Sequence, residues 1–175
     1  MHFDLINQAR SLAMLDLRGK PRQANLRRAV SSAYYAMFHF LVDESCRAII
    51  GTKHSQRGFR QALARSFAHT TMKKACGIYG SAQLTGNIQK SLPKNLTGQY
   101  VIPKPIQRVS AVFRELQGVR HLADYDLSEY FRRSEVILLI DQAEDAIRDF
   151  ASQPPSDDRH FFLVALLAWN DLTKH

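Results

Sequence analysis

Hydrophobic residues recur every three or four positions along most of the chain, which is the spacing that one face of an α-helix requires. The pattern predicts helices over residues 3–17, 23–50, 55–75, 105–125 and 128–150, with a short sixth helix after two prolines at 154 and 155. Glycine and proline mark several helix ends, and Ser128 followed by Glu129 is a favourable start for the fifth helix. No segment shows the convincing alternation that indicates a β-strand.

These elements predict an all-α fold, an up-and-down antiparallel bundle of about six helices, because short loops join most neighbours. Residues 1–153 are expected to form the bundle, and residues 154–175 a helical extension of the same domain. The segment 77–104 breaks the pattern, since it holds four glycines and two prolines and lacks a helical period. A connection of this length is usually a binding loop, a lid or a disordered insert, and disorder is the default expectation. Residues 100–102 are candidates to pack back onto the bundle or to form a short extended piece.

An arginine interrupts the apolar stripe of the helix predicted over 105–125. The stripe consists of Val109, Val112, Phe113, Leu116, Val119 and Ala123. Arg120 lies about 40° from Leu116 on the helical wheel, inside this stripe. A guanidinium is costly to bury alone, so Arg120 requires a carboxylate, a phosphate or a wet cleft. Asp124, one turn later, is the nearest partner. Two interpretations follow: a structural Arg–Asp pair, or a functional cleft.

The helix predicted over 23–50 has two patterned faces. Its core stripe consists of Leu26, Val30, Ala33, Tyr34, Met37 and Leu41. The opposite face carries Arg28, Ser32, Tyr35 and His39, spaced so that they lie on one line of the helix. A histidine alone is most often half-buried and satisfied by its surroundings. Four polar groups in register favour a face that meets a cleft or a partner subunit. The next helix, over 55–75, carries Phe59, Leu63, Phe67 and Met72.

Charge is distributed unevenly within a formal net charge of +8. Residues 1–125 hold 19 Lys and Arg against 6 Asp and Glu, whereas residues 126–175 hold 5 against 10. The 70 residues between Glu44 and Glu115 contain no acid and 12 cations. A stretch of one sign favours a polyanionic partner such as RNA, a nucleotide or an acidic protein. A basic domain without a nucleic-acid role, or neutralisation by the acidic C-terminal part, is the alternative.

Composition narrows the class of protein. A chain of 175 residues suffices for one domain with its own core, and its hydrophobic content of 45% is typical of a soluble globular protein. No apolar run reaches membrane-spanning length, and no export signal is recognisable, so a cytoplasmic protein without membrane contact is expected. Cys46 and Cys76 lack metal-ligand spacing, and we expect no disulfide, metal or cofactor.

Three motifs, in order along the chain, resemble those of HEPN-domain proteins. The run 28–39, which includes Ala29-Val30-Ser31 and Ala33-Tyr34-Tyr35-Ala36, is similar to the second helix of that family. Lys53-His54-Ser55, followed by Phe59 and Phe67, is similar to the start of its next helix. Arg120, Ala123, Asp124 and Tyr125 match an Arg-x-x-Ala-Asp-Tyr signature near the end of its later long helix. The resemblance covers most of residues 3–150, whereas the segment 77–104 and the tail after Pro155 depart from the compact family core.

The resemblance implies an all-α bundle that commonly forms a homodimer in a prokaryotic setting. It also implies a toxin-like partner of a minimal nucleotidyltransferase antitoxin, or a ribonuclease of a defence system. Nucleolytic relatives carry Arg, four to six residues, then His. Arg120 has no such His, but Arg114 and His121 satisfy the spacing and share one helix face with Tyr125. RNA cleavage without metal needs an acid–base group and a cation for the charged phosphate.

The catalytic candidates are therefore Arg120, His121, Asp124 and Arg114. The candidates for RNA or nucleotide binding are Arg28, Ser32, Tyr35, His39, His54, Lys73 and Lys74. In toxin–antitoxin relatives the nucleotidyltransferase adds AMP to a tyrosine beside the signature, which makes Tyr125 a candidate for modification. Two other classes stay open: a non-catalytic RNA or nucleotide-binding module, and an interaction protein in which Arg120 and Asp124 only hold the helix end.

Overall fold

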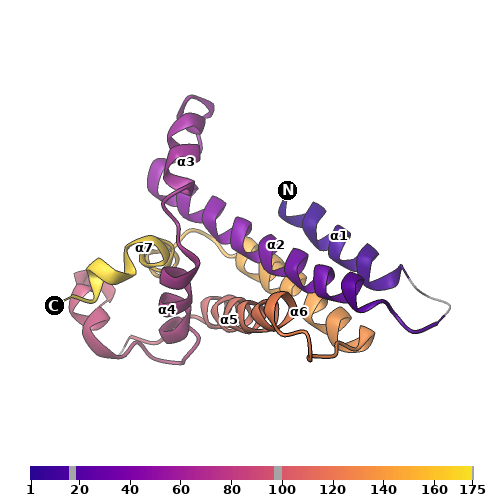
Figure 1. The fold of residues 1–175 in the computed structure, drawn as a ribbon. Coiled ribbons are helices and arrows are strands. Elements are labelled where there is room, and N and C mark those ends of the chain that lie inside the picture. The colour runs from indigo at the N-terminus through magenta and orange to yellow at the C-terminus, as the bar shows by residue number, and fades with distance from the viewer. Residues whose placement is uncertain (16–18, 97–99, 175) are drawn as a thin grey trace. The chain divides into compact units, whose positions relative to one another are not determined.

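The chain folds into helices joined by turns (Figure 1). The computed structural model describes residues 1–15, 19–96 and 100–174, and within them the only extended pairing is an isolated antiparallel bridge between Gln83 and Val101. The predicted all-α class is confirmed. Over the described residues the α-helices are α1 (His2–Met14), α2 (Gln23–Ile50), α3 (Arg57–Ala64), α4 (His69–Tyr79), α5 (Lys104–Tyr125), α6 (Arg133–Ser152) and α7 (Asp157–Leu172). The short 3₁₀ helices are η1 (His54–Gln56), η2 (Gly86–Ser91) and η3 (Lys94–Leu96).

Two compact units divide the chain, and each is built from two segments. Unit 1 comprises Met1–Phe40 and Val112–Ala151, and unit 2 comprises Leu41–Ala111 and Ser152–His175. The long helices α2 and α5 each contribute residues to both units. The functional candidates of the sequence are therefore distributed over two units, which are described separately below.

Unit 1 is an antiparallel packing of α1, the first part of α2, the last part of α5, and α6. Rings of α2 and α5 meet at Tyr34 and Phe113, with 5.6 Å between centroids, and Phe40 of α2 meets Phe150 of α6 edge-on. The first part of α2 is buried on almost every side. The core stripe predicted for it is confirmed, because Leu26, Val30, Ala33, Tyr34, Met37 and Leu41 are each at most 1% exposed.

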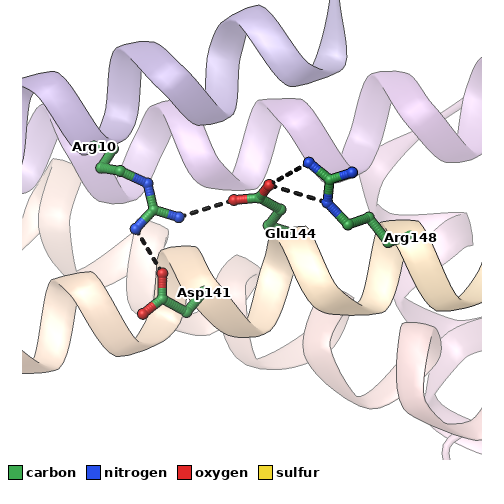
Figure 2. A network of polar contacts seen from close by, with 4 residues as sticks. All are labelled: Arg10, Asp141, Glu144 and Arg148. Atoms are coloured by element: carbon green, nitrogen blue, oxygen red, sulfur yellow. Dashed lines mark hydrogen bonds and ion pairs between the residues drawn. The ribbon is translucent and has the colours of Figure 1, made fainter.

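An ion-pair network joins α1 to α6 at the surface of unit 1 (Figure 2). Arg10 reaches Asp141 Oδ1 at 2.7 Å and Glu144 Oε2 at 2.8 Å, and Arg148 reaches the other oxygen of Glu144 at 2.6 Å. The guanidinium of Arg148 also lies over the ring of Phe3, 4.7 Å from its centroid. These contacts fix the register of α1 on α6, although exposed pairs of this kind contribute little free energy.

The helix α6 begins later than predicted. We expected a start at Ser128, whereas the helix begins at Arg133, because residues 126–131 form a turn that closes onto α2. The Ser128 hydroxyl and amide both donate to Asp126 Oδ1, so Ser128 is used inside the turn. Gln23 exchanges two side-chain hydrogen bonds with the backbone of Phe131, each 2.9 Å long. The predicted end of the first helix, at residue 17, lies outside the described residues.

Unit 2 is centred on the packing of α4 against α7. Tyr79 of α4 contacts two rings of α7, Phe162 at 4.9 Å and Trp169 at 6.4 Å between centroids. The helix α7 is longer than the short helix that was predicted, with 16 residues, and the Ser156 hydroxyl caps its first turn by accepting from the Arg159 amide. Cys46 and Cys76 are buried thiols without a disulfide.

The prediction of a single helix over 55–75 was wrong. The chain forms η1 and α3, turns at residues 65–68, and starts again as α4 at His69. A continuous helix would place Phe59, Leu63 and Phe67 on one stripe. The turn separates them instead, because Phe67 and Met72 are buried while Phe59 stays exposed. For this reason the described residues hold seven α-helices where about six were expected.

The default expectation of disorder over 77–104 was also wrong for its described residues. The helix α4 continues to Tyr79, and η2 and η3 follow. Leu84, Ile88 and Ile102 are almost fully buried, and the Ser91 hydroxyl donates to the Leu172 carbonyl of α7. The segment lacks a helical period because isolated apolar residues, rather than a helical stripe, anchor it. Ile102 packs inward, as expected if residues 100–102 pack back onto the helices.

Candidate functional site

Arg120 of α5 is held by a carboxylate, as its position in the apolar stripe requires. Its Nε lies 2.6 Å from Asp124 Oδ2, although the N–H direction does not make a well-aligned hydrogen bond. The two side chains remain 24% and 28% exposed. Around them most of the stripe is buried as predicted, with Phe113 and Leu116 fully covered, whereas Val119 is only half-buried. The guanidinium is therefore paired at the edge of the core, with part of its surface still open to solvent.

Two side chains of α2 complete this arrangement. The Ser31 hydroxyl donates to Asp124 Oδ1 at 2.9 Å, and the Arg120 Nη2 lies 3.4 Å from the Tyr35 hydroxyl. The guanidinium carbon also lies 5.6 Å from the ring centroid of Tyr35 and 5.8 Å from that of Tyr34, within cation–π range. We call Arg120, Asp124, Ser31 and Tyr35 the Arg120 cluster. It joins α2 to the end of α5 inside unit 1.

A second arginine, Arg27 of α2, closes the end of α5. Its guanidinium donates to the carbonyls of Ala123 and Asp126 at 2.9 Å and of Glu129 at 2.7 Å. The last carbonyls of a helix lack partners within the helix, and a cation near them also opposes the helix dipole. Arg27 was not among the predicted site residues. Its one sequence signal is that it precedes Ser31 by one turn on the face of α2 that meets α5.

The line of polar residues on the second face of α2 is largely covered. Ser32 is 7% exposed, Tyr35 and His39 are half-buried, and only Arg28 is exposed. The rings of Tyr35 and His39 are stacked, with 6.2 Å between centroids. Burial lowers the pKa of the His39 imidazole below its usual value of 6.5. His39 is therefore neutral at pH 7, so it can accept or donate a hydrogen bond without carrying charge.

The exposed side of α5 carries the other catalytic candidates. Arg114 and His121 are exposed, and the rings of His121 and Tyr125 are 5.0 Å apart between centroids. Tyr125 is 69% exposed, so its hydroxyl is open to solvent. These three residues share one face of the helix, as their spacing predicted, and this face points away from the Arg120 cluster. Arg120 and His121 are thus neighbours in sequence on different sides of α5.

The remaining binding candidates belong to unit 2. His54 lies in η1, and Lys73 and Lys74 lie in α4, all three exposed. The Lys74 ammonium lies 3.3 Å from the side-chain oxygen of Asn170. Within the described residues, each of these three side chains is thus open to a ligand.

The uneven charge distribution along the chain corresponds to a difference between the two units. Unit 1 contains eleven Lys and Arg and eleven Asp and Glu, whereas unit 2 contains thirteen against five. The whole formal net charge of +8 therefore belongs to unit 2. Much of the unit 1 charge is paired inside it, as Arg10 and Arg120 illustrate.

Comparison of the chain with protein-family models, with curated proteins and with solved structures finds no match. Among the residues that the structure describes, no helix is long and apolar enough to cross a membrane. In the same part of the chain, no group of three or more His, Cys, Asp or Glu side chains is arranged to hold a metal ion.

Proposed function

We propose that this chain is a HEPN-type protein of a toxin–antitoxin or defence system that acts in the cytoplasm and binds RNA. Unit 2 supplies the cations for the phosphate backbone, among them Lys73 and Lys74. Unit 1 supplies an exposed line of Arg114, His121 and Tyr125. The observation that carries the proposal is the confinement of the net charge to unit 2, because an excess of cations favours the binding of a polyanion.

In this proposal RNA is cleaved without metal on the exposed face of α5. The ribose 2′-hydroxyl attacks the adjacent phosphorus, and the bond from phosphorus to the 5′-oxygen breaks. The products are a 2′,3′-cyclic phosphate and a 5′-hydroxyl. His121 is the group that moves the proton, and Arg114 faces the charge that develops on the phosphate. Arg120 then has a structural role at the end of α5, since it pairs with Asp124, which also accepts from Ser31.

A homodimer would complete such a site, because two copies of His121 can serve as acid and base. The two copies would also double the cations around one phosphate backbone. We expect light scattering to give the mass of a dimer at tens of micromolar, a rough working concentration. A monomer at that concentration would contradict this part of the proposal.

The second candidate function is a non-catalytic RNA or nucleotide-binding module that partners a nucleotidyltransferase. One observation favours it: Arg120 is balanced by Asp124, and Asp124 is held by Ser31, as in a purely structural pair. In both versions Tyr125 is the proposed site of AMP addition, because its ring is open to solvent. Mass spectrometry after co-expression with a nucleotidyltransferase tests this. The same modification in Tyr125→Phe would rule out Tyr125 as the acceptor.

The deciding experiment is incubation of the pure protein with total RNA and with tRNA in the presence of a metal chelator. We expect cleavage by the wild type, and its loss in His121→Ala and Arg114→Ala. Arg120→Ala should lose activity only as far as it loses folded protein, which circular dichroism measures in parallel. Binding without cleavage would select the non-catalytic candidate. The absence of both binding and cleavage would refute both candidate functions.

A further inference from the structure

The helix α3 and the preceding η1 form an amphipathic segment without any buried residue. Phe59, Ala62 and Leu63 lie on one arc of α3, the arrangement that normally packs against a core. In this protein Phe59 is 69% exposed, Ala62 is exposed and Leu63 is only half-buried. The Phe59 ring is therefore open to contact with another molecule.

The charged residues that neighbour Phe59 in the sequence are all cations. Lys53, Arg57 and Arg65 are exposed, and no Asp or Glu occurs anywhere between Glu44 and Glu115. No carboxylate in the described part of the chain pairs with these cations. Arg60 is anchored to the backbone instead, donating to the carbonyls of Gly51 at 2.8 Å and of Lys53 at 3.0 Å. These bonds hold α3 against the end of α2 through neutral acceptors. We call residues 53–65 the basic tip.

We propose that the basic tip binds single-stranded RNA, with the Phe59 ring stacked on a base and the surrounding cations facing phosphates. This inference rests on the proposed RNA-binding function and assigns a contact within it. Proteins that bind single strands without sequence preference combine an aromatic platform with flanking cations in the same way. The base is supplied by an unpaired strand, because a duplex keeps its base faces stacked on one another.

Other occupants fit the same surface less well. A second copy of the basic tip would bring like charges together, which opposes association. An anionic lipid surface would match the charge, but binding there grows with inserted apolar area. Phe59 and Leu63 are the only large apolar side chains that α3 offers. Stacking on one base, by contrast, needs a single exposed ring.

The test uses the full chain and fluorescein-labelled oligouridine and oligoadenosine of about 12 nucleotides, within the range of known single-strand sites. Fluorescence anisotropy at about 50 mM salt gives the dissociation constants. We expect Phe59→Ala to weaken binding of the single strands about tenfold. Phe59→Leu, which is apolar but lacks a ring, should weaken binding as much, whereas Phe59→Trp should retain it. Leu138→Ala, at an exposed leucine of α6 in unit 1, is the control and should leave binding unchanged.

A second readout comes from the Phe59→Trp variant. Stacking on a base should quench the emission of the new tryptophan when oligouridine is added, relative to the wild type with its buried Trp169. A duplex of the same length should bind through its phosphates without this quenching. Circular dichroism of each variant checks that α3 and the rest of the fold are retained.

The outcomes separate the inference from the proposed function. If the wild type binds no RNA at low salt, both are overturned. If Phe59→Ala or Phe59→Leu binds single strands as tightly as the wild type, the stacking contact is overturned while RNA binding stands. Vesicles of phosphatidylglycerol provide the last arm. If the wild type binds them and Phe59→Ala loses that binding but keeps its RNA affinity, the occupant is a lipid surface and the inference fails.

Discussion

The arginines at the junction of α2 and α5 and the cations of the basic tip present opposite uses of positive charge. Arg27 and Arg120 are each engaged by several groups of unit 1, through carbonyls, a carboxylate and aromatic rings. In the basic tip, Arg57 and Arg65 are exposed, and no carboxylate among the described residues pairs with them. Unit 1 is electrically balanced, while unit 2 carries the excess.

This contrast teaches that a conspicuous arginine is not automatically a ligand-binding arginine. Arg120 stands out in the sequence because it interrupts an apolar stripe, and that same position is what forces it to find partners within the fold. The cations of unit 2 look ordinary in the sequence. Their significance is collective, since unit 2 has thirteen cations against five acids and none of these acids lies between residues 45 and 111. Stability should therefore respond to changes in the first group, and RNA affinity to changes in the second.

The largest expected effect on stability is that of Arg27→Ala. The substitution leaves one carbonyl at the end of α5 and two in the following turn without their donor, so we expect the free energy of unfolding to fall by about 3 kcal/mol. Urea denaturation followed by circular dichroism measures it. Arg28→Ala is the matched control, because Arg28 is the exposed neighbour and should change stability very little. Equal effects of the two substitutions would mean that the carbonyl contacts of Arg27 do not stabilise the fold.

Arg120→Ala comes next. It removes the partner of Asp124 at a position that is only 24% exposed, and we expect a loss of about 2 kcal/mol. The double variant with Ser31→Ala should lose less than the sum of the two single changes, because both side chains act through Asp124. Additive losses in the double-mutant cycle would show that the Arg120 cluster is not a coupled unit.

A smaller effect is expected in the α1–α6 network shown in Figure 2. Hydrogen bonds from Arg148 and then Arg10 lower the pKa of the Glu144 carboxyl below 4.5. A carboxyl with a lowered folded pKa stabilises the protein above its unfolded pKa, and this contribution is lost as the pH falls through the folded pKa. Glu144→Gln should therefore cost about 1 kcal/mol at pH 7 and progressively less below pH 4.5. Glu135→Gln, whose ion pair with Arg132 spans 3.6 Å, is the control and should show a smaller loss.

The smallest stability change is expected in the basic tip. Arg57→Gln and Arg65→Gln remove exposed cations, so thermal unfolding should shift by about 1 °C or less. A marked loss of stability would mean that these cations have partners within the fold, and the contrast with unit 1 would disappear.

Local sequence patterns predicted the parts of the structure that local rules determine. The helix predicted over 23–50 matches α2 at both ends, and the pairing of Arg120 with Asp124 followed from their spacing of one turn. The predicted helix bounds that were wrong share one cause, which is tertiary contacts. Ser128 is a favourable helix start, but it lies in the turn that precedes α6. Gln23 and Arg27 of α2 hold this turn in place by donating to its carbonyls.

In the candidate site, too, local spacing predicted some features, and contacts between distant residues determined the others. Spacing alone placed Arg114, His121 and Tyr125 on one face of α5. No spacing rule connects Arg27 or Ser31 with α5, because their partners lie about ninety to one hundred residues away along the chain. The break between α3 and α4 was also hidden, since Phe59 and Phe67 fit one helical stripe and only the fold reveals that one of them is left uncovered.

The salt dependence of RNA affinity tests directly whether unit 2 binds RNA. A plot of log affinity against log salt should fall steeply for the wild type, because each phosphate contact releases counterions. Lys73→Gln combined with Lys74→Gln should reduce the slope by about 1.4 on a single strand. Arg10→Gln combined with Arg148→Gln removes two paired cations of unit 1 and should leave the slope unchanged. A flat salt dependence, or an equal reduction from both pairs, would contradict the assignment of RNA binding to unit 2.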